Sequence, residues 1–245
     1  MKKHSSVLML VTRSTIYRVL GLLIVMAAAE AGLFWLRLQQ GAIDGNFSLE
    51  AVISESRLTW ACAAIFLFVT AVLSWGSSTV SGAYTSARLS IPSKMVFLWQ
   101  CVYNILCYLI FWMVQILVMI ALCRVYEAQA PAEFVSNQTV FLAFYRSDFL
   151  HSILPFEDTW CWVRNLALVM ALGICASRCP GKQSGKFRFH DILAIATVFF
   201  FVREIGAAGN YIFMLLLSML CAGIAVGNVL KKDSAEGVVE GGGSV

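Results

Sequence analysis

The chain has 245 residues, of which 60% are hydrophobic and only 13% are charged, and its formal net charge is +4. Soluble domains are about 45–50% apolar and about 25% charged, so this composition indicates an integral membrane protein and excludes a soluble catalytic domain of ordinary size. Because the lysines and arginines lie beside apolar segments, they indicate membrane orientation and not a nucleic-acid site.

Apolar segments of spanning length follow one another along the chain. A helix needs about 20 apolar residues to cross a hydrocarbon layer of about 30 Å. The sequence predicts an all-α bundle of six transmembrane helices, with an interfacial helix at 1–15, short amphipathic outer helices and a flexible tail at 231–245. We expect the spans at about 16–36, 58–75, 95–126, 160–176, 190–205 and 211–230.

Polar side chains inside these spans are candidate functional residues, because a polar or charged group at membrane depth normally faces a cavity or another polar group. The first span contains Glu30, which can also face a polar crevice or the outer headgroups. We predict that a translocation path is lined by Glu30, Gln115, Arg164, Arg203 and Glu204. The alternative interpretation is pairing that only satisfies charge, for example Glu30 with Arg164 or Glu204 with Arg203.

The link between the second and third spans carries apolar side chains at helical spacing, including Val80, Tyr84 and Ile91, and Pro92 ends the segment. This pattern predicts a short amphipathic helix on the membrane surface. It is either a simple connector or a docking element for a soluble partner.

Two later segments are too short to cross a membrane. The apolar clusters at 140–145 and 149–154 predict surface helices that cap the bundle on its outer side. The fifth apolar run, 192–202, covers about 16 Å as a helix. It therefore either carries Arg203 and Glu204 into the membrane or turns back as a re-entrant segment.

Six crossings place both termini on one side, and most of the lysines and arginines fall on that side, which indicates the cytoplasm. Segment 181–187 superficially resembles a phosphate loop, but Phe187 replaces the Ser or Thr that would bind magnesium. We expect no catalytic, cofactor-binding or metal-binding residue in this chain, and we do not expect an enzyme. Most of the eight cysteines lie in or beside apolar helices, where cysteine acts as a small hydrophobe.

The span layout, together with the sequences at 84–90, 97–104 and 144–151, resembles the membrane subunits of bacterial ATP-binding-cassette exporters of the six-span, two-component type. The outer segment at 203–210 is shorter than that family's pattern. The resemblance implies a permease in the bacterial inner membrane that pairs with a second permease copy, identical or different. It also implies a cytosolic ATPase partner that holds ATP and magnesium. The docking residues would be Val80, Tyr84, Arg88 and Ile91.

Such a permease would move an amphipathic, lipid-like or peptide-like substrate by alternating access between two packings of the bundle. Two other functions fit the same layout. One is a six-span substrate-capture subunit of an uptake transporter, which also lacks an ATPase. The other is a non-transporting membrane scaffold or immunity protein.

Overall fold

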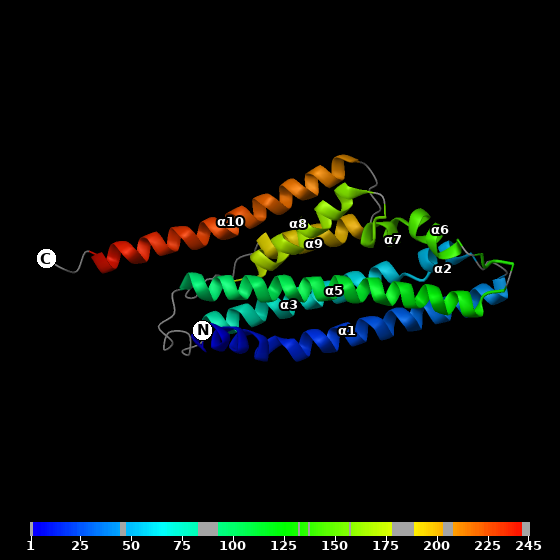
Figure 1. The fold of residues 1–245 in the computed structure, drawn as a ribbon, viewed down its shortest axis with the longest axis horizontal. Coiled ribbons are helices and arrows are strands. Elements are labelled where there is room, and N and C mark those ends of the chain that lie inside the picture. Colours follow the sequence, from blue (N-terminus) through cyan, green and yellow to red (C-terminus); the bar gives the residue numbers. More distant parts are fainter. Residues whose placement is uncertain are drawn as a thin grey trace.

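The computed structural model describes residues 2–44, 48–82, 93–131, 133–136, 138–156, 158–177, 189–202 and 208–241, and within these ranges every regular element is a helix. Figure 1 shows an elongated bundle in which the long helices alternate in direction. The helices are α1 (Lys2–Asp44), α2 (Leu49–Glu55), α3 (Leu58–Gly82), α5 (Ser93–Gln129), α6 (Thr139–Arg146), α7 (Asp148–Ile153), α8 (Thr159–Ala176), α9 (Phe189–Val202) and α10 (Ala208–Gly241).

Within the described residues, five helices contain a segment that is long and apolar enough to cross a membrane. Large apolar side chains such as Ile24, Phe68 and Leu216 are mostly exposed on these helices, which is the pattern of a surface that faces lipid. The chain is therefore a multi-pass, all-helical membrane protein. The five segments are Thr15–Gly41, Leu58–Ser78, Lys94–Gln129, Thr159–Ala176 and Ile212–Leu230.

The span expected at 190–205 is not among these five segments. Its counterpart α9 has 14 residues, which cover about 21 Å at about 1.5 Å per residue. Helix α9 contacts α3, α8 and α10 and runs antiparallel to α8 and α10. Arg203 and Glu204 lie outside the described residues, and so does the choice between a full crossing and a re-entrant segment.

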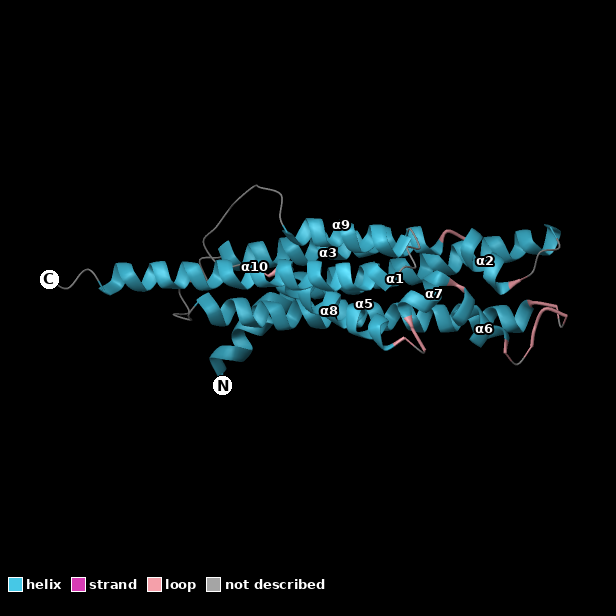
Figure 2. Ribbon diagram, turned by 90° about the horizontal axis from the view of Figure 1, so that it is seen from above, coloured by secondary structure: helices cyan, strands magenta, loops and turns pink. Residues whose placement is uncertain are grey.

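The two ends of the chain are more helical than the sequence suggested. Helix α1 begins at Lys2 and continues without a break through the region expected as a separate interfacial helix, although Figure 2 shows that its first turns bend away from the rest. Helix α10 continues through most of the expected tail, to Gly241. Residues 2–15 contain neither proline nor glycine, so nothing local stops the helix before the first span.

Three short helices, α2, α6 and α7, lie at one end of the bundle, which we call the capped end (Figure 1). Helices α6 and α7 match the surface helices expected at 140–145 and 149–154, whereas α2 is not among the elements expected from the sequence. The Ser48 side chain caps α2 by accepting a hydrogen bond from the Ala51 amide at 3.3 Å. Buried side chains of the cap, including Val52 and Leu150, share one hydrophobic cluster with Phe34 of α1 and Tyr126 of α5.

The long helices form two groups that meet chiefly where α5 packs against α8, and also where α3 contacts α9. Helix α1 packs mainly against α3 and α5, and α8 packs mainly against α10 and α5. Figure 1 shows α8, α9 and α10 on one side and α1, α3 and α5 on the other. The first turns of α1 and the last turns of α10 lie at the same end of the bundle, opposite the cap, which we call the terminal end.

Candidate functional site

Helix α5 carries a stripe of polar side chains through the bundle interior. Gln100, Asn104, Tyr108 and Gln115 follow one another at spacings that keep them on one helical face, and all four are buried. Polar groups at this depth in a membrane protein must find partners on neighbouring helices or line a cavity. The neighbours of this stripe therefore locate the candidate site.

At the middle of the bundle, Gln115 meets Glu30 of α1. Gln115 Nε2 donates a hydrogen bond of 2.9 Å to Glu30 Oε1. Glu30 is 0% exposed and Gln115 is 2% exposed, and both lie near the middle of their candidate spans. The structure thus brings together two of the five residues expected along a translocation path, a pairing that the sequence did not predict.

This pair leaves two oxygen atoms without a hydrogen-bond partner. They are Glu30 Oε2 and Gln115 Oε1, one on each member of the pair. A buried acceptor without a donor costs about 1–3 kcal/mol. Two such oxygens at one place indicate a site that is completed by a further donor, by a proton on Glu30 or by a positive charge.

The pairing of Glu30 with Arg164 that was considered from the sequence does not form. The Arg164 guanidinium donates from Nε and Nη2 to Asn165 Oδ1 at 3.1 and 3.0 Å, and from Nη2 to the Ser152 carbonyl at 3.5 Å. Asn165 Nδ2 donates to the same carbonyl at 2.8 Å. Arg164 therefore ties α8 to the cap, and no ion pair within the described residues includes Glu30.

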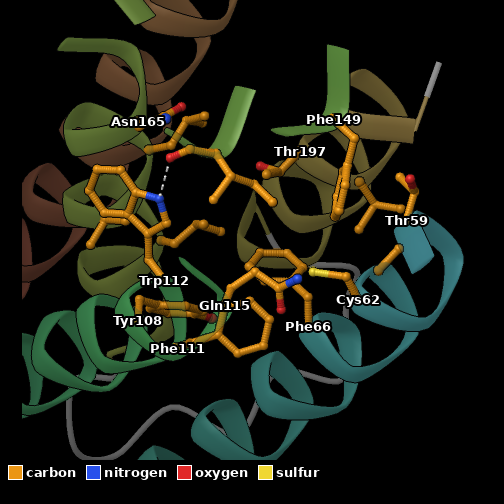
Figure 3. A pocket seen from close by; sticks show the side chains of 16 residues that line it. Thr59, Cys62, Phe66, Tyr108, Phe111, Trp112, Gln115, Phe149, Asn165 and Thr197 are labelled. Atoms are coloured by element: carbon orange, nitrogen blue, oxygen red, sulfur yellow. Dashed lines mark hydrogen bonds between the residues drawn. The ribbon is translucent and has the colours of Figure 1, made fainter. Parts of the chain in front are cut away.

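A cavity of about 110 Å³ lies beside the pair, between α3, α5, α7, α8 and α9 (Figure 3). Its wall is predominantly apolar and rich in aromatic rings, and Gln115 forms part of it. The aromatic wall residues are Phe66, Tyr108, Phe111, Trp112 and Phe149.

Contacts among the aromatic side chains hold this wall in place. Trp112 Nε1 donates to the Ile153 carbonyl at 2.9 Å, the dashed line in Figure 3, and so ties α5 to the end of α7. The Phe66 ring lies 5.9 Å from the Tyr108 ring and 5.7 Å from the Phe111 ring, in tilted and edge-to-face geometry. The cavity therefore has a preformed wall.

A second polar cluster lies along α5 toward the terminal end. Asn104 Nδ2 donates to Ser77 Oγ at 3.2 Å and to Ser177 Oγ at 3.0 Å, and so joins α3, α5 and the end of α8. The hydroxyls of Thr15 and Tyr103 lie 2.7 Å apart and join α1 to α5. Asn104 itself is buried in the bundle. Its hydrogen bonds indicate a structural role.

The expected docking residues fall mostly outside the described part of the chain. Val80 belongs to α3, and Tyr84, Arg88 and Ile91 lie beyond the described residues. Helix α3 ends and α5 begins at the terminal end of the bundle (Figure 1). The link that contains these residues therefore connects two helix ends on the side opposite the cap.

Comparisons with protein families, with curated proteins and with solved structures found no match. The feature of this chain that points to a function is the bundle interior. There, carboxyl and amide oxygens that accept hydrogen bonds lie next to an aromatic cavity that accepts an apolar group. This arrangement suits the binding of an amphipathic molecule.

Proposed function

We propose that the chain is the permease subunit of an ATP-binding-cassette exporter and moves an amphipathic substrate across a bacterial inner membrane. The observation that carries this proposal is the buried Glu30–Gln115 pair, which has two unpartnered oxygens and lies beside a cavity at the middle of the bundle. Transporters commonly bind their substrates near the bilayer midplane, between groups of helices. A scaffold would gain nothing from an incomplete polar pair at that depth.

The two groups of helices provide a means of alternating access. The cavity takes its wall from α3 and α5 in one group and from α7, α8 and α9 on the other side. Rotation of one group against the other would open the cavity toward either membrane face, as in other rigid-body transitions. The substrate would therefore bind where the two groups meet.

Energy would come from a separate cytosolic ATPase that holds ATP and magnesium. This part of the proposal rests on the sequence resemblance, which implies docking through Val80, Tyr84, Arg88 and Ile91 and pairing with a second permease copy. It also requires the terminal end of the bundle to face the cytoplasm. The basic residues between and beyond the spans favour that orientation.

Copurification tests the proposal. The tagged chain, extracted gently from its native membrane, should bring down a cytosolic ATPase, and Tyr84→Asp or Arg88→Asp should abolish that association. Arg124→Asp is the matched control, because Arg124 is exposed near the capped end of α5. Wild-type recovery of the ATPase with both docking variants would contradict the docking role, and absence of any ATPase would contradict the exporter.

A substrate-capture subunit of an uptake system is the second candidate. One observation favours it: five helices of one chain, α3, α5, α7, α8 and α9, together line the cavity. Such a subunit would retain its ligand tightly as an isolated monomer. Rapid dissociation of substrate from the purified chain, accelerated further by the ATPase partner with ATP, would favour the exporter instead.

A further inference from the structure

We propose that the Glu30–Gln115 pair and the neighbouring aromatic cavity form a binding site for a small lipophilic cation, an ammonium group that carries one aryl or short alkyl substituent. This inference names the substrate class of the same site, and it rests on the proposed function only for the claim that the bound cation is transported.

The charge of the ligand follows from the two unpartnered oxygens. Gln115 Oε1 is an acceptor, and so is Glu30 Oε2 in the ionised carboxylate. Both belong to side chains that are at least nine-tenths buried, and the Gln115 side chain forms part of the cavity wall. A buried carboxylate is stabilised by a paired positive charge, and the described residues provide none in an ion pair with Glu30. An anionic ligand would instead place like charges together at low dielectric.

The type of cation follows from the number of oxygens and from the aromatic wall. Two side-chain oxygens are far fewer than the six to eight that a calcium ion takes. Aromatic faces attract an ammonium group, most strongly where water is excluded, and Phe66, Phe111 and Trp112 all belong to this wall. The site is therefore better suited to an organic cation than to a metal ion.

The size of the apolar substituent follows from the volume of the cavity. At about 110 Å³, the cavity is somewhat smaller than an apolar cavity of about 150 Å³ that holds benzene. It therefore accepts at most one ring or one branched alkyl group. The positive end of the ligand would lie at Glu30 and Gln115.

Radiolabelled benzylammonium is a suitable probe, because at neutral pH it is an ammonium ion with one aryl-bearing substituent and three N–H groups that can donate to both oxygens. We expect saturable binding to the purified full-length chain in lipid nanodiscs, without ATPase. Glu30→Gln removes the charge and keeps the shape, and it should weaken binding by about ten-fold or more. Glu50→Gln is the matched control, because this partly exposed carboxylate at the capped end pairs with Arg146, and it should leave binding unchanged.

A second measurement needs no variant. Ethylbenzene has the shape of the probe without its charge, and at equal free concentration it should displace the probe at least about ten-fold less well than unlabelled benzylammonium. Three results would overturn the cation site. They are equal displacement of the probe by the neutral and the charged compound, wild-type affinity of a folded Glu30→Gln variant for the probe, and absence of saturable binding.

The two proposals fail separately. Because the binding assay contains no ATPase, loss of cation binding would leave the copurification result intact and would refute only the substrate class. Intact cation binding without any ATPase partner would refute the exporter and leave the site.

Discussion

Gly173 of α8 lies directly against the backbone of Ile105 of α5. A Cβ atom built on Gly173 would lie 2.8 Å from Ile105 N and 3.0 Å from Ile105 Cα. Backbone atoms cannot move aside as the end of a side chain can, so only glycine permits this approach, as small residues do where membrane helices cross closely. The contact joins the two groups of helices one residue away from Leu172, which is part of the cavity wall.

Substitution of Gly173 should therefore destabilise the bundle. We expect Gly173→Ala to lower the free energy of unfolding by about 1–3 kcal/mol through overpacking, and Gly173→Leu to lower it further. Gly223→Ala is the control, because a Cβ there meets nothing within 4 Å, and alanine is favoured over glycine in a helix. Thermal unfolding in detergent compares the variants, and equal midpoints for Gly173→Ala and Gly223→Ala would contradict the close contact.

The polar pair should be dispensable for stability but not for function. Glu30→Met alone leaves the buried Gln115 amide without its acceptor, which should lower stability by about 1–3 kcal/mol. Replacing both residues with methionine removes all of the unsatisfied groups, so the double variant should be at least as stable as either single variant. It should nevertheless lose substrate-stimulated transport with the ATPase partner.

Reversible unfolding of the four proteins in this cycle gives the coupling between the two side chains. Hydrogen bonds between membrane helices average about 0.6 kcal/mol in such cycles and reach about 1.7 kcal/mol. If the double variant were less stable than both single variants, the pair would be a structural element of the bundle, and its assignment to substrate would be wrong.

Asn104 should be more important for stability than either of its hydrogen-bond partners. Its amide donates to Ser77 Oγ and Ser177 Oγ, so Asn104→Ala breaks two interhelical bonds, whereas Ser77→Ala or Ser177→Ala breaks one of them. With about 0.6 kcal/mol for each bond, Asn104→Ala should lower stability by roughly 1 kcal/mol. Thermal unfolding measures the three variants. A serine variant as unstable as Asn104→Ala would show that the two bonds are not separate contributions.

Local signals in the sequence predicted the five spans and singled out Glu30 and Gln115. The length of an apolar run determines whether a helix can cross, and a polar side chain inside such a run is conspicuous by itself. The pairing of these two residues was not predictable, because they are 85 positions apart. Their contact depends on how each helix is rotated about its axis. The sequence does not determine that rotation, because the side that faces lipid and the side that faces the bundle are both apolar.

Glycine positions show the same limit. Gly223 and Gly227 have the four-residue spacing that favours helix packing, but a Cβ at either position meets nothing within 4 Å in this chain, whereas the isolated Gly173 makes the close contact.

Helix α2 could have been found from the sequence. Ser48 followed by apolar residues at Leu49, Val52 and Ile53 is a typical helix start with an amphipathic pattern.

The positions of the two chain ends determine whether the number of membrane crossings is even or odd. The N-terminal end of α1 and the C-terminal end of α10 lie on the same side of the bundle (Figure 1). Two termini on one side require an even number of crossings. The segment around α9 should therefore cross the membrane despite its short length. In a chain without its eight native cysteines, single cysteines at Arg13, Gln138 and Ser234 report this topology. A membrane-impermeant maleimide on intact cells should label Gln138→Cys, near the capped end, and should label Arg13→Cys and Ser234→Cys only after permeabilisation. Labelling of Arg13→Cys and Ser234→Cys from opposite sides would mean five crossings and a re-entrant α9. Labelling of both from outside intact cells would mean that the orientation is reversed. The docking link would then lie away from any cytosolic ATPase.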